Sequence, residues 1–62
     1  MTKQQMKKAN QMIDNMKTVE DFNNVRKYMM TIPVEEQTHM YDIIFGSAYD
    51  KAEYDLGLKI TY

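Results

Sequence analysis

The chain has 62 residues, of which 44% are hydrophobic, 27% are charged and none is cysteine. This length predicts a single domain, 1–62, with a small core, because chains of this size bury only about 60% of the surface that they expose when unfolded. The lack of cysteine excludes disulfides and thiolate metal sites. The N-terminus has no signal-peptide pattern, and no apolar run approaches the roughly 20 residues of a membrane span, so we expect a cytoplasmic protein.

Charge is divided between the two halves of the chain. Residues 1–31 carry a formal charge of +3 and residues 32–62 carry −4. No catalytic set of residues accompanies this division. A small protein with a basic end and an acidic end is more typical of a docking module than of an enzyme.

Hydrophobic spacing predicts two short helices in the first half. Apolar residues recur on one helical face over about residues 3–16, and a second apolar stripe with a different phase follows over 19–30. Thr18 is a suitable N-cap for the second helix, and Asp21 occupies the third position of a capping box. A break near Thr18 therefore separates the two helices.

A long acidic third helix is expected over about residues 33–56. Pro33 fits the first turn of a helix, and an apolar stripe continues from there with three- and four-residue spacing. Gly57 is a natural stop, and 58–62 is expected to be a short tail. Gly46 inside the run predicts either a kink or the close approach of another backbone. The expected fold is all-α, a small bundle of three helices.

Candidate metal chemistry rests on one pair of residues. Glu36 precedes His39 by three positions, which is the Glu-x-x-His spacing of di-metal carboxylate bundles. A complete site needs further inward carboxylates that one chain does not supply. The favoured interpretation is that His39 is a surface residue, and we expect no metal, no cofactor and no enzymatic activity.

The first helix carries a thin basic face. Lys3, Lys7 and Lys17 lie roughly opposite its apolar stripe and could contact phosphates. The acidic third helix would be repelled by a phosphate backbone, so a solvated lysine face is favoured over direct nucleic-acid binding.

Small and flexible apolar residues suit an adaptable surface. The chain has seven methionines, more than a core of this size is expected to bury together with seven aromatic residues. Gly46, Ser47, Ala48 and Ala52 form a small-residue strip on which another helix could lie. Packing of that strip within the chain itself is slightly favoured.

Two stretches resemble the Hha/YmoA family of small enterobacterial nucleoid-associated modulators. Residues 18–25, Thr-Val-Glu-Asp-Phe-Asn-Asn-Val, are similar to the opening of that family's second helix. The family's long-helix pattern of an aromatic residue, a Ser-Ala pair, an Asp, a Leu and a closing Tyr is matched by Phe45, Ser47, Ala48, Asp50, Leu56 and Tyr62. The joining segment is longer here, and the family's Trp-containing tail is missing.

The resemblance implies a non-enzymatic protein that attaches to the dimerisation region of an H-NS-type nucleoid protein and alters gene silencing. It assigns to Asp50 the family's acidic contact with basic residues of the partner. The residues expected to bind a protein partner are Asp50, Asp42, Glu53, Asp55, Tyr49 and Tyr54. The carboxylates would give orientation and on-rate, and the tyrosines are candidate apolar anchors.

Three alternatives stay open. A small phage or mobile-element inhibitor that blocks a surface of a host enzyme or transcription factor has the same features. Direct nucleic-acid binding through the first helix is a second alternative, and a structural homodimer is a third. No membrane partner is expected.

Overall fold

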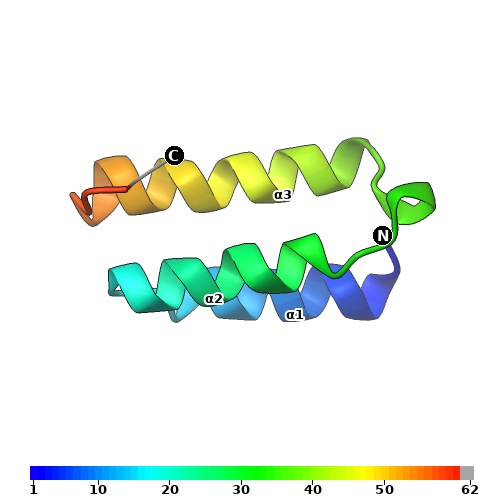
Figure 1. Ribbon diagram of the computed structural model, residues 1–62, viewed down its shortest axis with the longest axis horizontal. Helices are drawn as coiled ribbons and strands as arrows, with labels where there is room; N and C mark the ends of the chain where they lie inside the picture. The colour runs from blue at the N-terminus through cyan, green and yellow to red at the C-terminus, as the bar shows by residue number, and fades with distance from the viewer. Residues whose placement is uncertain (61–62) are drawn as a thin grey trace.

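The fold is a bundle of three helices with a short helical turn before the third. The computed structural model describes residues 1–60, and within that range it contains helices and no strand, which confirms the all-α prediction. The elements in chain order are α1 (Lys3–Asp14), α2 (Val19–Met30), the 3-10 turn η1 (Val34–Glu36), α3 (His39–Asp50) and the π-helical turn η2 (Lys51–Asp55). Figure 1 shows α1 and α2 side by side with α3 running along both. None of the helices in this range is long and apolar enough to cross a bilayer.

Capping boxes begin the first two helices. The Thr18 hydroxyl accepts a hydrogen bond from the Asp21 N–H at 3.1 Å, and the Asp21 carboxylate accepts from the Thr18 N–H at 3.2 Å. Thr2 and Gln5 make the equivalent pair at the start of α1. These bonds satisfy backbone donors that a helix leaves unpaired in its first turn. The helix α2 accordingly has the bounds that the sequence predicts.

The core lies where the three helices meet. Phe22, Val25 and Met29 of α2 are almost fully buried, and Met16 is buried in the loop after α1, which ends at Asp14 and not at residue 16. Within residues 1–60 the buried apolar residues are Ala9, Ile13, Met16, Phe22, Val25, Met29, Ile32, Ile44, Ala48 and Ala52. Ala48 and Ala52 therefore pack within the chain, as the favoured interpretation of the small-residue strip predicts, whereas Gly46 and Ser47 of the same strip are exposed.

The third helix begins later than the sequence predicts. Pro33 leads into a single 3-10 turn, and the chain leaves the helical conformation at Gln37, where ψ is 88°. Thr38 is extended, and the α-helix starts at His39. The acidic residues before Gln37 therefore lie outside α3, and one continuous acidic helix from residue 33 is not what the structure contains.

Tertiary hydrogen bonds account for this break. The Glu36 carbonyl accepts from the amino group of Met1 at 2.6 Å, and the Glu36 carboxylate accepts from the Gln5 side-chain amide at 3.0 Å. The Gln37 amide group donates to the Ile32 carbonyl at 3.0 Å. These contacts hold residues 33–37 against the start of α1 and against Ile32. They take the place of the backbone hydrogen bonds that a helix starting at Pro33 would form.

The third helix ends in a π-helical turn. After Asp50 the backbone continues as the π-helical turn η2, in which the Leu56 N–H bonds to the Lys51 carbonyl at 2.9 Å. Gly57 then adopts a φ of +64°, and the Leu58 N–H bonds to the Ala52 carbonyl at 2.8 Å. Gly57 therefore ends the helix, as expected. Leu58 and Ile60 pack against the core, whereas Thr61 and Tyr62, including the closing Tyr of the family pattern, lie outside the described residues.

Gly46 has no packing role in the described chain. A Cβ atom built at Gly46 meets no heavy atom within 4 Å, and α3 passes through this position as regular α-helix. The expected close approach of another backbone is therefore wrong within residues 1–60. An exposed glycine in a helix interior costs about 0.5–1 kcal/mol relative to alanine.

We predict that Gly46→Ala raises the free energy of unfolding by about 0.5–1 kcal/mol, because alanine restricts the unfolded chain and meets no steric obstacle. Gly57→Ala is the matched control and should lower it by about 1 kcal/mol, because a side chain disfavours positive φ. Urea titration of each variant measures the change. A destabilised Gly46→Ala would contradict the packing described.

The second prediction concerns the capping carboxylate of α2. The Lys17 N–H is the largest influence on the pKa of Asp21 and lowers it below its ordinary value of 3.8; burial opposes this, and the Thr18 N–H and hydroxyl lower the pKa further. Because the folded-state pKa is lowered, the resulting stability is present above the ordinary pKa and is lost as the pH falls through the folded-state value. Urea titrations at several acidic pH values should therefore show a weaker pH dependence in Asp21→Asn than in the wild type. Identical profiles would rule out this contribution.

Candidate partner-binding face

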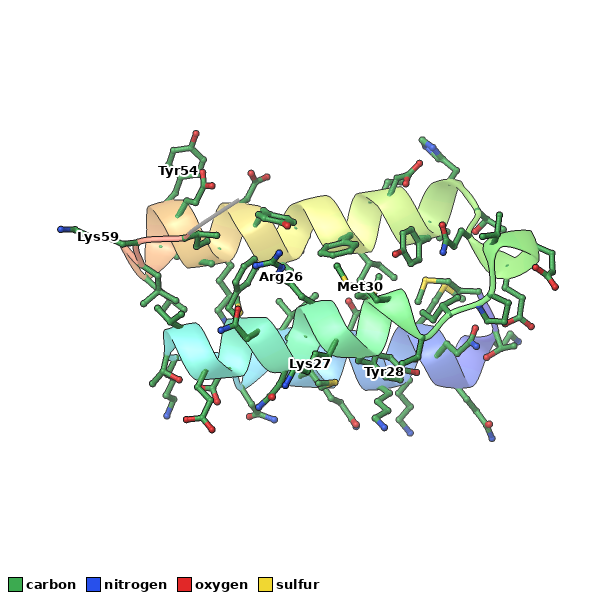
Figure 2. The ribbon with its side chains drawn as sticks, viewed as in Figure 1. Arg26, Lys27, Tyr28, Met30, Tyr54 and Lys59 are labelled. Atoms are coloured by element: carbon green, nitrogen blue, oxygen red, sulfur yellow. The ribbon has the colours of Figure 1, made fainter. Side chains whose placement is uncertain are left out.

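One side of α3 faces away from the rest of the bundle. At about 100° per residue, four exposed residues of α3 fall within a narrow sector opposite buried Ala48, and exposed Tyr54 follows one turn later in η2. Among them, Ile43 is 48% exposed and Tyr54 is 80% exposed. Figure 2 shows Tyr54 projecting from the helix away from α1 and α2. We call this set the α3 outer stripe; its members are Met40, Ile43, Ser47, Asp50 and Tyr54.

An open hollow of about 540 Å³ adjoins the stripe, between the end of α1 and the end of α3. Asp14, Asp50 and Asp55 line this hollow, and Lys51 is the one basic residue among the lining residues that the structure describes. The remaining lining residues are Ile13, Ser47 and Tyr54. The hollow therefore carries net negative charge beside an exposed aromatic ring.

Lys51 connects the third helix to the end of the first. Its ammonium donates to the Ile13 carbonyl at 2.6 Å and to the Asp14 carbonyl at 3.1 Å. These carbonyls belong to the last turn of α1, which contains no basic residue of its own. A cation at this end satisfies unpaired carbonyls and interacts favourably with the helix dipole.

The π-helical turn changes which acidic residues share a side. Asp50 and Asp55 are five positions apart, and a regular α-helix would separate them by about 140°. The i to i+5 bonding of η2 instead leaves both at the same hollow. A sequence pattern of 3.6 residues per turn could not identify this pair.

Three of the predicted binding residues lie on another side of α3. By the same count, Asp42, Tyr49 and Glu53 are displaced from the stripe toward α2. Asp42 is exposed, whereas Glu53 is half-buried, and its Oε1 atom is buried without a hydrogen-bond partner. The structure therefore brings Asp50, Asp55 and Tyr54 together and leaves the other three apart from them.

Tyr49 belongs to a row of aromatic rings that closes the bundle. Its ring lies 4.9 Å from that of Phe22, edge to face, and 5.4 Å from that of Phe45, in a stacked arrangement. Phe45 continues the row to Tyr41 at 5.7 Å. Burial, reinforced by the neighbouring Asp42 carboxylate, raises the pKa of Tyr41. Part of the surface of Tyr49 is thus already used in packing, in contrast to Tyr54.

The Glu36 and His39 pair is not on one helix. Glu36 ends η1, whereas His39 starts α3, and the extended residue Thr38 separates them. The Glu36 carboxylate accepts a hydrogen bond from the Gln5 side chain, and His39 is exposed. Residues 1–60 contain no group of three histidine or acidic side chains arranged to hold a metal ion. The helical geometry on which the metal hypothesis depended is therefore absent from this segment.

The lysines of the first helix lie at the surface. Lys3 and Lys7 of α1 are exposed, as is Lys17 in the loop that follows, and Lys8 places its ammonium 4.7 Å from the centre of the Tyr28 ring. This arrangement is compatible with a solvated face and with phosphate contacts alike.

Comparisons of the chain with protein-family models, curated proteins and solved structures give no match. The resemblance to the Hha/YmoA family stays a prediction.

We predict that Lys51→Met lowers the free energy of unfolding by about 1–2 kcal/mol, because the α1 carbonyls lose a charged donor while the aliphatic side chain is largely kept. Lys59→Met, at an exposed position, is the matched control and should change it by less than about 0.5 kcal/mol. Chemical denaturation measures both. Equal effects of the two substitutions would show that the contact to α1 contributes nothing to stability.

Proposed function

We propose that this chain is a non-enzymatic protein-binding module that modulates its partner through the α3 outer stripe and the adjoining acidic hollow. The partner surface would be cationic with apolar residues among the charges. An H-NS-type nucleoid protein, and through it transcription, is the partner that the family resemblance implies. The site would thus centre on Asp50, Asp55 and Tyr54.

The exposed composition of the stripe carries this proposal. Ile43 and Tyr54 are large apolar side chains left in water on a helix that buries its opposite side. Between them lie Gly46 and Ser47, which are small and exposed, so a partner backbone could approach closely. Desolvated aromatic anchors supply much of the binding energy of protein interfaces.

The charge of the site indicates the kind of partner. Asp50 and Asp55 are exposed and make no hydrogen bond or ion pair with another described side chain. Carboxylates in this position attract a basic surface, accelerate its encounter and fix its orientation. A long acidic helix, as the sequence suggests, is not needed for this role, because the relevant carboxylates lie on the final turns of α3 and η2.

The first test measures binding to the purified dimerisation region of an H-NS-type protein by calorimetry. Asp50→Lys should weaken binding at least about tenfold, because it places like charges opposite each other. Tyr54→Ala should weaken it through loss of the anchor. Glu20→Lys on α2 makes the same charge change at another exposed position and should leave affinity within about threefold.

Two results would contradict the proposal. Binding that is unaffected by Asp50→Lys and Tyr54→Ala would exclude the α3 outer stripe. Binding of a DNA fragment that survives Asp50→Lys, weakens steeply with salt and is lost in Lys3→Gln with Lys7→Gln would instead support the nucleic-acid alternative.

A further inference from the structure

A second exposed stripe lies on α2. Val19 is 42% exposed and Met30 is 66% exposed, and Asn23 and Lys27 are exposed between them. At about 100° per residue these four residues fall within one sector of the helix. Asn23, Lys27 and Met30 also line one open hollow together with Arg26. We call Val19, Asn23, Lys27 and Met30 the α2 stripe.

The α2 stripe matches one part of the α3 outer stripe, from Ile43 to Tyr54, in length and in the order of its side chains. Val19 to Met30 and Ile43 to Tyr54 are separated by the same number of residues, about 16 Å in regular α-helix, and Met40 lies one turn before this part. Each of the two segments has a large apolar residue at both ends. Each has a small polar residue four positions after the first apolar one, Asn23 in α2 and Ser47 in α3.

The two stripes carry opposite charges, Lys27 and Asp50, at similar distances along their helices. With the helices parallel and Val19 aligned with Ile43, Lys27 lies about 12 Å beyond Val19 and Asp50 about 10 Å beyond Ile43. The antiparallel arrangement would place Asp50 opposite Asn23 instead. The parallel register therefore pairs the charges, and it places Gly46 and Ser47 where the Asn23 region of the other helix must come close.

We propose that the chain associates with a second copy of itself, with the α3 outer stripe of one copy packed parallel against the α2 stripe of the next. Because the two stripes are different surfaces, this contact is heterologous and leaves one stripe of each kind free at the ends of a pair. Pairs can therefore grow into rings or rows. The area is small, so the association is expected to be weak, concentration-dependent and favoured by low salt.

This inference rests on the exposure and complementarity of the stripes and not on the proposed partner. Self-association would compete with partner binding, because a second copy of the chain and the partner would both occupy the α3 outer stripe. The α2 stripe belongs only to self-association, and substitutions there separate the two proposals.

Sedimentation velocity over a range of protein concentrations at low salt tests the contact. Wild-type chain should form species larger than pairs. Ile43→Glu and Met30→Glu each remove one stripe at an exposed position, and each variant alone should stay monomeric. An equimolar mixture should form pairs and nothing larger, because only the α2 stripe of Ile43→Glu and the α3 outer stripe of Met30→Glu remain intact.

The register has its own test. Asp50→Lys and Lys27→Asp should each raise the dissociation constant of self-association at least about tenfold, and the double variant in one chain should recover it. Circular dichroism checks that all variants keep their helical content. Lys27→Asp should leave binding to the H-NS-type probe within about threefold in the dilute chain, which distinguishes failure of this inference from failure of the proposed function.

Three outcomes would overturn the inference. Wild-type chain that is monomeric at all concentrations and salt levels excludes self-association. Dimers that persist in Met30→Glu indicate a closed dimer through another surface. A double charge variant that fails to recover association while keeping its fold excludes the parallel pairing of Lys27 with Asp50.

Discussion

The contact of Lys51 with the last carbonyls of α1 determines how the bundle is closed at one end. It joins two segments that are far apart in the sequence and brings a positive charge to the end of α1, whose last turn contains no basic residue. The same contact places the start of η2 against α1, and so it positions the hollow that Asp14, Asp50 and Asp55 share. The exposed side of α3, with Asp50 and Tyr54, lies away from Ile44 and Ala48, which pack in the core.

Local signals in the sequence were sufficient for α2 and for the end of the helical region. Thr18 with Asp21, and Gly57 after the last apolar turn, act within a few residues of themselves, so neighbouring structure does not change their effect. Pro33 was misleading for the opposite reason. Its preference for a helix start is small compared with the hydrogen bonds that Met1 and Gln5 make to Glu36 from another part of the chain.

The candidate site was predictable in part. Exposed carboxylates and Tyr54 follow from their spacing away from the buried stripe, but the grouping of Asp50 with Asp55 depends on the π-helical bonding, for which the sequence gives no signal. The packing of Tyr49 against Phe22 depends on which helix lies opposite, and a single-helix pattern does not contain that information. The α2 stripe was not predicted from the sequence, because hydrophobic spacing identifies the buried side of a helix and gives no signal for which of its exposed residues form a contact surface.

The distribution of methionines has a chemical consequence for oxidising conditions. Met16 and Met29 are almost fully buried, whereas Met30 and Met40 have their thioethers at the surface, one on each exposed stripe. A peroxide would reach the surface pair first and convert these apolar ends into polar sulfoxides. The two exposed stripes would thus become less hydrophobic while the core stayed intact. Oxidation would therefore weaken association before it unfolded the chain.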